Sequence, residues 1–169
     1  IDLEYELAGC EFLWLRLLAY HDRPRVDVEI AMHKIGTWDT ENLYVALPFT
    51  LGDGQAFHVD RGAGPMRPGV DQIPGTLTDY LGVQEGIAWT NPSRGIAVAQ
   101  RDSHLVQLGS LAHGERQIAA GRPVGTDSCV HAWLMTNYWE TNFSPELAGF
   151  YTFRFSVMWG EAMKDPAAA

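Results

Sequence analysis

Short runs in which apolar and polar residues alternate cover most of this chain, and they constrain its fold more than any other feature. Residues 1–7 and residues 26–32 both place an apolar side chain at nearly every second position, with acidic side chains between them. Successive side chains of a β-strand point to opposite faces of the sheet, so this alternation is typical of strands with one buried face. Because almost no stretch has the 3.6-residue period of a helix, the sequence predicts an all-β chain.

The predicted strands are short and are separated by turns rich in Gly, Pro and Asp. The first three resemble an antiparallel meander, and the composition of Gly52–Gly54 (GDG) predicts a hairpin turn. Such spacing predicts one large antiparallel β-sandwich with long loops, over residues 1–163, followed by a tail of residues 164–169 that frays. The predicted strands are 1–7, 11–20, 26–32, 43–51, 55–60, 81–90, 96–100, 105–108, 128–138 and 150–159.

Composition excludes several classes of function. The chain has 169 residues and a formal net charge of −9, which disfavours binding to nucleic acids or to an anionic membrane surface. It contains no apolar run of the length that spans a bilayer and no signal-peptide pattern. Because it begins at Ile1 within a strand-like pattern, we interpret it as a fragment or a processed piece. Cys10 and Cys129 are far apart, and we expect buried free thiols in a reducing compartment, the cytoplasm.

Four segments, in a fixed order, carry a resemblance to a known family. Together they resemble the C-terminal β region of glycoside hydrolase family 38, the α-mannosidase-type enzymes, with His104 at a position where that family usually has Pro. The segments are Tyr44–Phe49 (YVALPF), Asp71–Thr76 (DQIPGT) with Asp79-Tyr80 and Val83-Gln84, Arg101–Gly109 (RDSHLVQLG), and Leu134–Phe143 (LMTNYWETNF) with Gly149 and Phe153–Phe155.

This resemblance implies a galactose-mutarotase-like supersandwich packed beside an N-terminal catalytic domain. In such enzymes a zinc ion and an aspartate nucleophile cleave α-mannosides with retention of configuration. We therefore expect this chain to be the non-catalytic β-sandwich portion, which braces the catalytic domain and lends a loop, residues 61–76, to the mannoside cleft.

The matching segments also supply candidate carbohydrate-binding residues, because aromatic faces and amide or carboxylate groups suit sugar rings and hydroxyls. The alternative is structural: the aspartates would orient loop backbone, Trp139 would lie in the core, and Asn142 would bond to backbone. The candidates are Asp71, Gln72, Asp79, Tyr80, Trp139 and Asn142.

Catalytic and metal-binding signals are weak in this chain. The family's zinc ligands lie mainly in the other domain, in a motif of the form His-x-Asp-x-x-Trp. Here His58-Val59-Asp60 lacks the following Trp, and two ligands do not complete a zinc site. The sequence therefore predicts no metal site, no cofactor and no catalytic residue in this segment, and no α-mannosidase activity for the chain alone.

Two other functions stay open at this point. The chain is alternatively a free-standing carbohydrate-binding module that holds mannosides by aromatic stacking. A second alternative is a mutarotase-like aldose epimerase, which uses a His acid and a Glu base. The residues available for that chemistry are His131, His104, Glu85 and Glu140.

Overall fold

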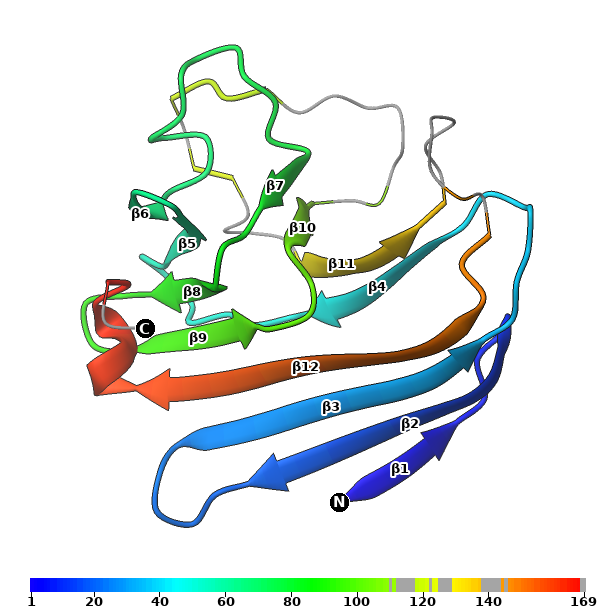
Figure 1. The fold of residues 1–169 in the computed structure, drawn as a ribbon. Helices are drawn as coiled ribbons and strands as arrows, with labels where there is room; N and C mark the ends of the chain where they lie inside the picture. The colour runs from blue at the N-terminus through cyan, green and yellow to red at the C-terminus, as the bar shows by residue number, and fades with distance from the viewer. Residues whose placement is uncertain are drawn as a thin grey trace.

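The computed structural model of the chain consists of two antiparallel β-sheets (Figure 1). It describes residues 1–109, 111, 118–121, 123–124, 129–137, 144 and 146–167. In this part of the chain the only helical element is one 3₁₀ turn, η1 (Glu161–Lys164). No helix there has the length and apolar character needed to cross a bilayer. The prediction of an all-β antiparallel sandwich is confirmed.

The larger sheet has eight strands within the described residues, in the order β1-β2-β3-β12-β9-β8-β5-β6. The long strand β12 lies at its centre and pairs with β3 on one side and β9 on the other. The first three strands form the predicted meander. The strands are β1 (Asp2–Tyr5), β2 (Cys10–Ala19), β3 (Arg25–Lys34), β5 (Ala56–Arg61), β6 (Gly64–Met66), β8 (Gly86–Thr90), β9 (Gly95–Gln100) and β12 (Gly149–Gly160).

The smaller sheet has four strands in the described residues, in the order β4-β11-β10-β7. They are β4 (Asn42–Leu47), β7 (Tyr80–Gly82), β10 (Leu105–Leu108) and β11 (Val130–Thr136). β4 ends directly before Pro48, which has no N–H to donate to the ladder.

Side chains from both sheets meet in one hydrophobic core. Phe57, Val59 and Val98 from the larger sheet and Val106 and Val130 from the smaller one are each at most 2 % exposed. Phe57 and Val59 are alternate residues of β5, so the pattern that predicts this strand also selects its buried face.

The prediction that residues 81–90 form one strand is wrong, because two strands share these residues. Residues 81–90 form the end of β7 in the smaller sheet and then β8 in the larger sheet, joined by a corner at residues 83–85. At this corner the N–H of Val83 donates to the His104 carbonyl, and Gly86 lies so close to Val98 that a Cβ would be 2.6 Å from its carbonyl oxygen. Apolar alternation continues through the corner, so the sequence pattern does not reveal it.

The larger sheet extends beyond the smaller one at β1 and β2, which lie at its edge (Figure 1). Leu3 and Tyr5 of β1 are directly opposite Leu15 and Leu13 of β2, whose side chains face the core. Residues opposite each other share a face, yet Leu3 is 38 % and Tyr5 is 48 % exposed. We call this apolar surface, formed by the exposed Leu3 and Tyr5 and the partly buried Leu13 and Leu15, the overhang.

Candidate functional site

A polar groove of about 630 Å³ crosses the face of the larger sheet that points away from the core. We call this face the outer face. Strands β2, β3, β12 and β9 contribute to the groove, and Gln84, Glu85 and His104 line it from the segments that join strands. Ala99 is a small residue opposite Ser156, and it leaves room in the sheet surface between longer side chains.

A row of alternating charges runs across the groove. Arg16, Glu29 and Arg154 are direct cross-strand neighbours on β2, β3 and β12. The row continues at both ends, because Arg16 Nε lies 2.7 Å from Asp2 Oδ1 and Arg154 donates to both oxygens of Asp102 at 2.8 and 2.7 Å. The Arg154 guanidinium lowers the pKa of the Asp102 carboxyl. Opposite charges placed directly across a sheet stabilise its register.

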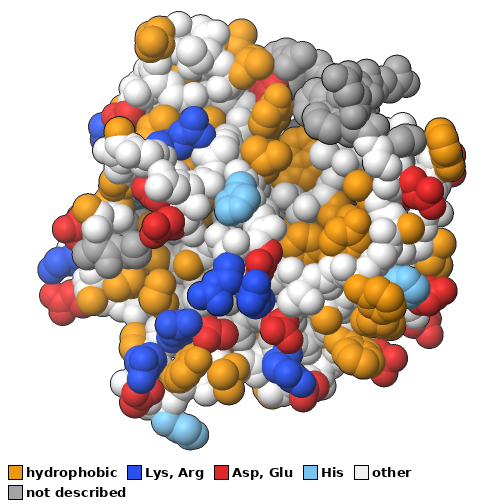
Figure 2. Space-filling view, viewed as in Figure 1, with side chains coloured by type: hydrophobic (Ala, Val, Ile, Leu, Met, Phe, Trp, Pro, Cys, Tyr) orange, Lys and Arg blue, Asp and Glu red, His pale blue; other side chains and the backbone are white. Residues whose placement is uncertain are grey.

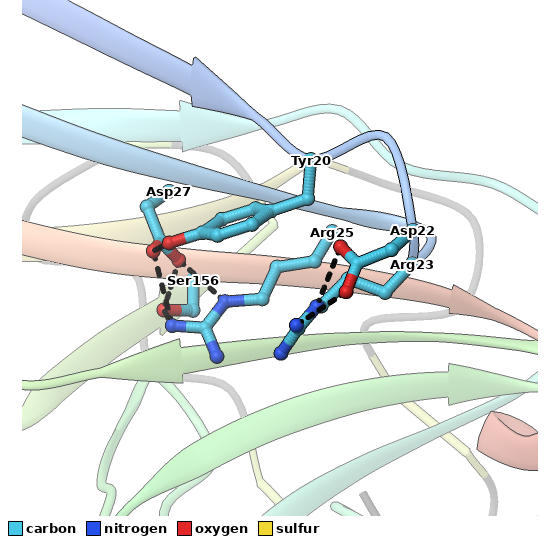
Figure 3. Close-up of polar contacts among 6 residues, drawn as sticks. All are labelled: Tyr20, Asp22, Arg23, Arg25, Asp27 and Ser156. Atoms are coloured by element: carbon cyan, nitrogen blue, oxygen red, sulfur yellow. Dashed lines mark hydrogen bonds and ion pairs between the residues drawn. The ribbon is translucent and has the colours of Figure 1, made fainter.

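A second network lies at one end of the groove, near the turn between β2 and β3 (Figure 3). Arg25 donates from Nε and Nη2 to the two oxygens of Asp27, at 2.7 and 3.0 Å. Ser156 Oγ donates to Asp27 at 2.7 Å, and the Tyr20 hydroxyl donates to the other carboxylate oxygen at 2.7 Å. These bonds, led by that of Arg25, lower the pKa of Asp27 to about 2. Asp27 is therefore a fixed, charged acceptor.

Figure 3 also shows the neighbouring pair of Asp22 and Arg23, at the tip of the same turn. Arg23 donates to both oxygens of Asp22, but both side chains are more than half exposed. Arg23 and Arg25 each lie over the ring of Tyr20, 5.3 and 5.4 Å from its centroid. The Tyr20 ring thereby makes a cation–π contact with each of the two guanidinium groups.

The charges in the groove nearly cancel. Four arginines face three carboxylates, and most of these groups are already paired. A lining of this kind presents fixed donors and acceptors without a strong net field, which suits an uncharged ligand with many hydroxyl groups better than an ion. The charged residues that line the groove are Arg16, Arg25, Arg101, Arg154, Asp27, Glu29 and Glu85.

An adjoining cavity of about 500 Å³ contains the His-x-Asp pair that the sequence singles out. His58 and Asp60 both line it, and Pro166 closes one side. His58 Nε2 lies 3.0 Å from Thr90 Oγ1, and burial lowers the pKa of the imidazole. Among the residues that the structure describes, no third His, Cys, Asp or Glu joins the pair in a group that could hold a metal ion.

Two of the predicted carbohydrate-binding residues hold the backbone of their own loop. Asp71 accepts a hydrogen bond from the Arg67 N–H at 2.8 Å and pairs with its guanidinium at 2.8 Å, which lowers the pKa of the carboxyl. Gln72 accepts from the Gly69 N–H at 2.9 Å and donates to the Leu77 carbonyl at 3.2 Å. These contacts correspond to the structural alternative for this segment.

The other candidates lie on the smaller sheet or outside the described residues. Tyr80 begins β7, and its ring meets that of Trp133 edge to face, with centroids 5.7 Å apart. The Asp79 carbonyl accepts from the Leu108 N–H at 3.1 Å. Trp139 and Asn142 lie outside the described residues. None of the four described candidates lines the groove.

Both cysteines are free thiols, as predicted, but they are only partly buried. The Cys10 thiol donates to Met32 Sδ at 3.9 Å, and burial raises its pKa. A thiol with a raised pKa is a poor nucleophile at neutral pH, so Cys10 packs rather than reacts.

The chain matches no protein-family model and no curated protein sequence. The resemblance to family 38 glycoside hydrolases therefore depends on the four segments themselves.

Proposed function

We propose that this chain is the β-sandwich portion of an α-mannosidase-type glycoside hydrolase, and that it supports the enzyme's catalytic domain. The ordered segments support the family, and the antiparallel sandwich is the architecture which that resemblance implies. In this proposal the zinc ion and the nucleophile belong to the catalytic domain, and the mannoside binds there. The segment of residues 61–76 would reach the edge of its cleft; the structure shows that it is not one loop as predicted, because it contains the end of β5 and the short strand β6 before the loop that follows. The free thiols fit a reducing compartment such as the cytoplasm.

The overhang is the observation that carries this proposal. Leu3 and Tyr5 continue the core-facing surface of Leu13 and Leu15, yet no strand of the smaller sheet in the described residues covers them. Contiguous exposed apolar surface next to a core is typical of an interface with another domain. The opposite side of β1 carries Asp2 and Glu4, so the strand has one face suited to a partner and one suited to water.

Hydrolysis by the isolated chain tests the division of labour. The purified chain, supplied with zinc and a 4-nitrophenyl α-mannoside, should release no nitrophenol above a blank without protein. Measurable hydrolysis would overturn the supporting role. The adjoining coding sequence provides an independent test: a His-x-Asp-x-x-Trp segment is expected there, and a neighbouring region without one contradicts the assignment.

A second candidate function follows from the groove. Two of the four residues available for epimerase chemistry, His104 and Glu85, line the same groove, where one could donate a proton and the other accept one. If the chain is an aldose epimerase, polarimetry of freshly dissolved galactose should show faster mutarotation, which His104→Ala and Glu85→Gln should each abolish. Glu4→Gln on β1 is the matched control. A mutarotation rate equal to that of buffer rules this function out.

A further inference from the structure

Four aromatic side chains form an exposed cluster on the outer face, beyond the row of charges. Phe12, His33 and Phe150 are direct cross-strand neighbours on β2, β3 and β12, and Trp14 lies two residues further along β2. We call these four residues the aromatic platform. Trp14 is 54 % and Phe150 is 75 % exposed. Figure 2 shows hydrophobic side chains gathered beside a histidine over this end of the three strands.

The rings of the platform hold one another in place. His33 stacks on Phe150 with ring centroids 4.1 Å apart and planes 5° apart. The Phe12 ring lies between the two exposed rings, with its centroid 5.0 Å from that of Trp14 and 6.1 Å from that of Phe150. Glu11 fixes the imidazole through a 2.5 Å contact with Nδ1. A ligand would therefore meet rings that are already oriented, at little cost in side-chain entropy.

We propose that the aromatic platform binds a neutral saccharide. The C–H groups on one face of a sugar ring would pack on the exposed rings of Trp14 and Phe150. The Glu11 carboxylate, whose side chain is 62 % exposed, would accept hydrogen bonds from sugar hydroxyls. This inference does not rest on the supporting role proposed above, because the platform and the overhang lie on opposite faces of β2.

The surroundings of the platform favour a saccharide over a protein partner. Trp14 and Phe150 together expose on the order of 300 Å², and charged side chains border this area. The apolar area ends within two rows of side chains along the strands. The row that follows Trp14 on the outer face is the charged row of Arg16, Glu29 and Arg154. The acidic Glu11 beside the rings and the net charge of −9 also disfavour nucleic acid.

Isothermal titration calorimetry of the full chain with mannotriose and with cellotriose tests the proposal. At least one trisaccharide should bind saturably, with a Kd on the order of 1 mM, the affinity of an open platform rather than an enclosed pocket. Trp14→Ala and Phe150→Ala should each weaken binding about tenfold, and Glu11→Gln should weaken it about threefold. Both aromatic rings are exposed, so the variants should keep the far-ultraviolet circular dichroism of the parent.

Trp159→Ala is the matched control, because Trp159 is also exposed and lies roughly 30 Å from Phe150 along β12. It should leave the affinity unchanged. Absence of saturable binding to both sugars would overturn the proposal, and so would full binding by the Trp14→Ala, Phe150→Ala double variant. If that variant instead loses association with a second copy of the chain, the platform is a protein interface. Failure of the supporting role would appear separately, as hydrolysis by the isolated chain.

Discussion

Asp27 is the residue on which most of the polar contacts at the end of the groove converge. Its carboxylate accepts from Arg25, Ser156 and Tyr20, and its pKa is about 2, compared with an ordinary value of 3.8. We predict that Asp27→Asn lowers the free energy of unfolding at pH 7 by about 1–2 kcal/mol. This is less than the full free energy that corresponds to the pKa shift, because the network is partly exposed to solvent. Urea unfolding monitored by tryptophan fluorescence measures the loss.

The pH dependence of this loss identifies its origin. The folded state binds the Asp27 proton more weakly than the unfolded state, so the stabilisation is complete above about pH 4 and disappears as pH falls through 2. The parent and the Asp27→Asn variant should therefore converge in stability between pH 4 and 2. Asp22→Asn, which removes only the exposed pair with Arg23, should leave stability nearly unchanged at every pH in this range, because solvent screens that pair. A constant difference between the parent and Asp27→Asn across that range would contradict the assignment.

At the scale of elements, η1 packs against the end of the central strand β9 through a glycine. Gly95, the first residue of β9, has no positive φ, but a Cβ at this position would overlap the Met163 carbonyl. We predict that Gly95→Ala destabilises the chain by about 1–3 kcal/mol or detaches η1 from β9. Hydrogen exchange of residues 161–167 should become faster. In a chain that ends at Gly160, the same substitution should cost nothing, and an equal cost in both backgrounds would show that the contact with η1 is not the cause.

Strands that stay in one sheet along their whole length were predictable from the sequence. The β1–β2–β3 meander and β12 follow from local alternation, because each strand stays in one sheet along its length. The pattern failed at residues 81–90, where alternation continues while the chain passes from one sheet to the other. It also tells which residues point outward, but not which of them meet.

The groove illustrates that second limit. Arg16, Glu29 and Arg154 are ordinary outward-facing residues in the sequence, and only the register of β2, β3 and β12 brings them into one row. Asp71 is a candidate because it lies in a segment that resembles the family. Its actual contacts, to the N–H and the guanidinium of Arg67, depend on the conformation of one loop. Alternation fixes faces but not neighbours, so the strands were more predictable than the site.

For the whole molecule, the two faces of β1 and β2 have different consequences. The outer face is dominated by paired charges and by the aromatic platform, whereas the overhang exposes Leu3 and Tyr5, which continue the core surface. When no partner domain is present, the overhang faces water. The hydrophobic effect then favours contact between the overhangs of two chains, and the edge of β1 that pairs with no other described strand is available to the same contact.

We predict that the isolated chain forms a dimer through the overhang at micromolar to millimolar concentrations, and that Leu3→Glu or Tyr5→Glu shifts it to a monomer. Both side chains are exposed in the single chain, so the free energy of unfolding of the monomer should change by no more than about 0.5 kcal/mol. Size-exclusion chromatography with light scattering measures the mass. Ile73→Glu is the matched control, since Ile73 is 76 % exposed in a loop away from β1. A dimer that persists in both overhang variants and dissociates in the Ile73 variant would place the association surface elsewhere. It would also contradict the proposal that the overhang receives a partner domain.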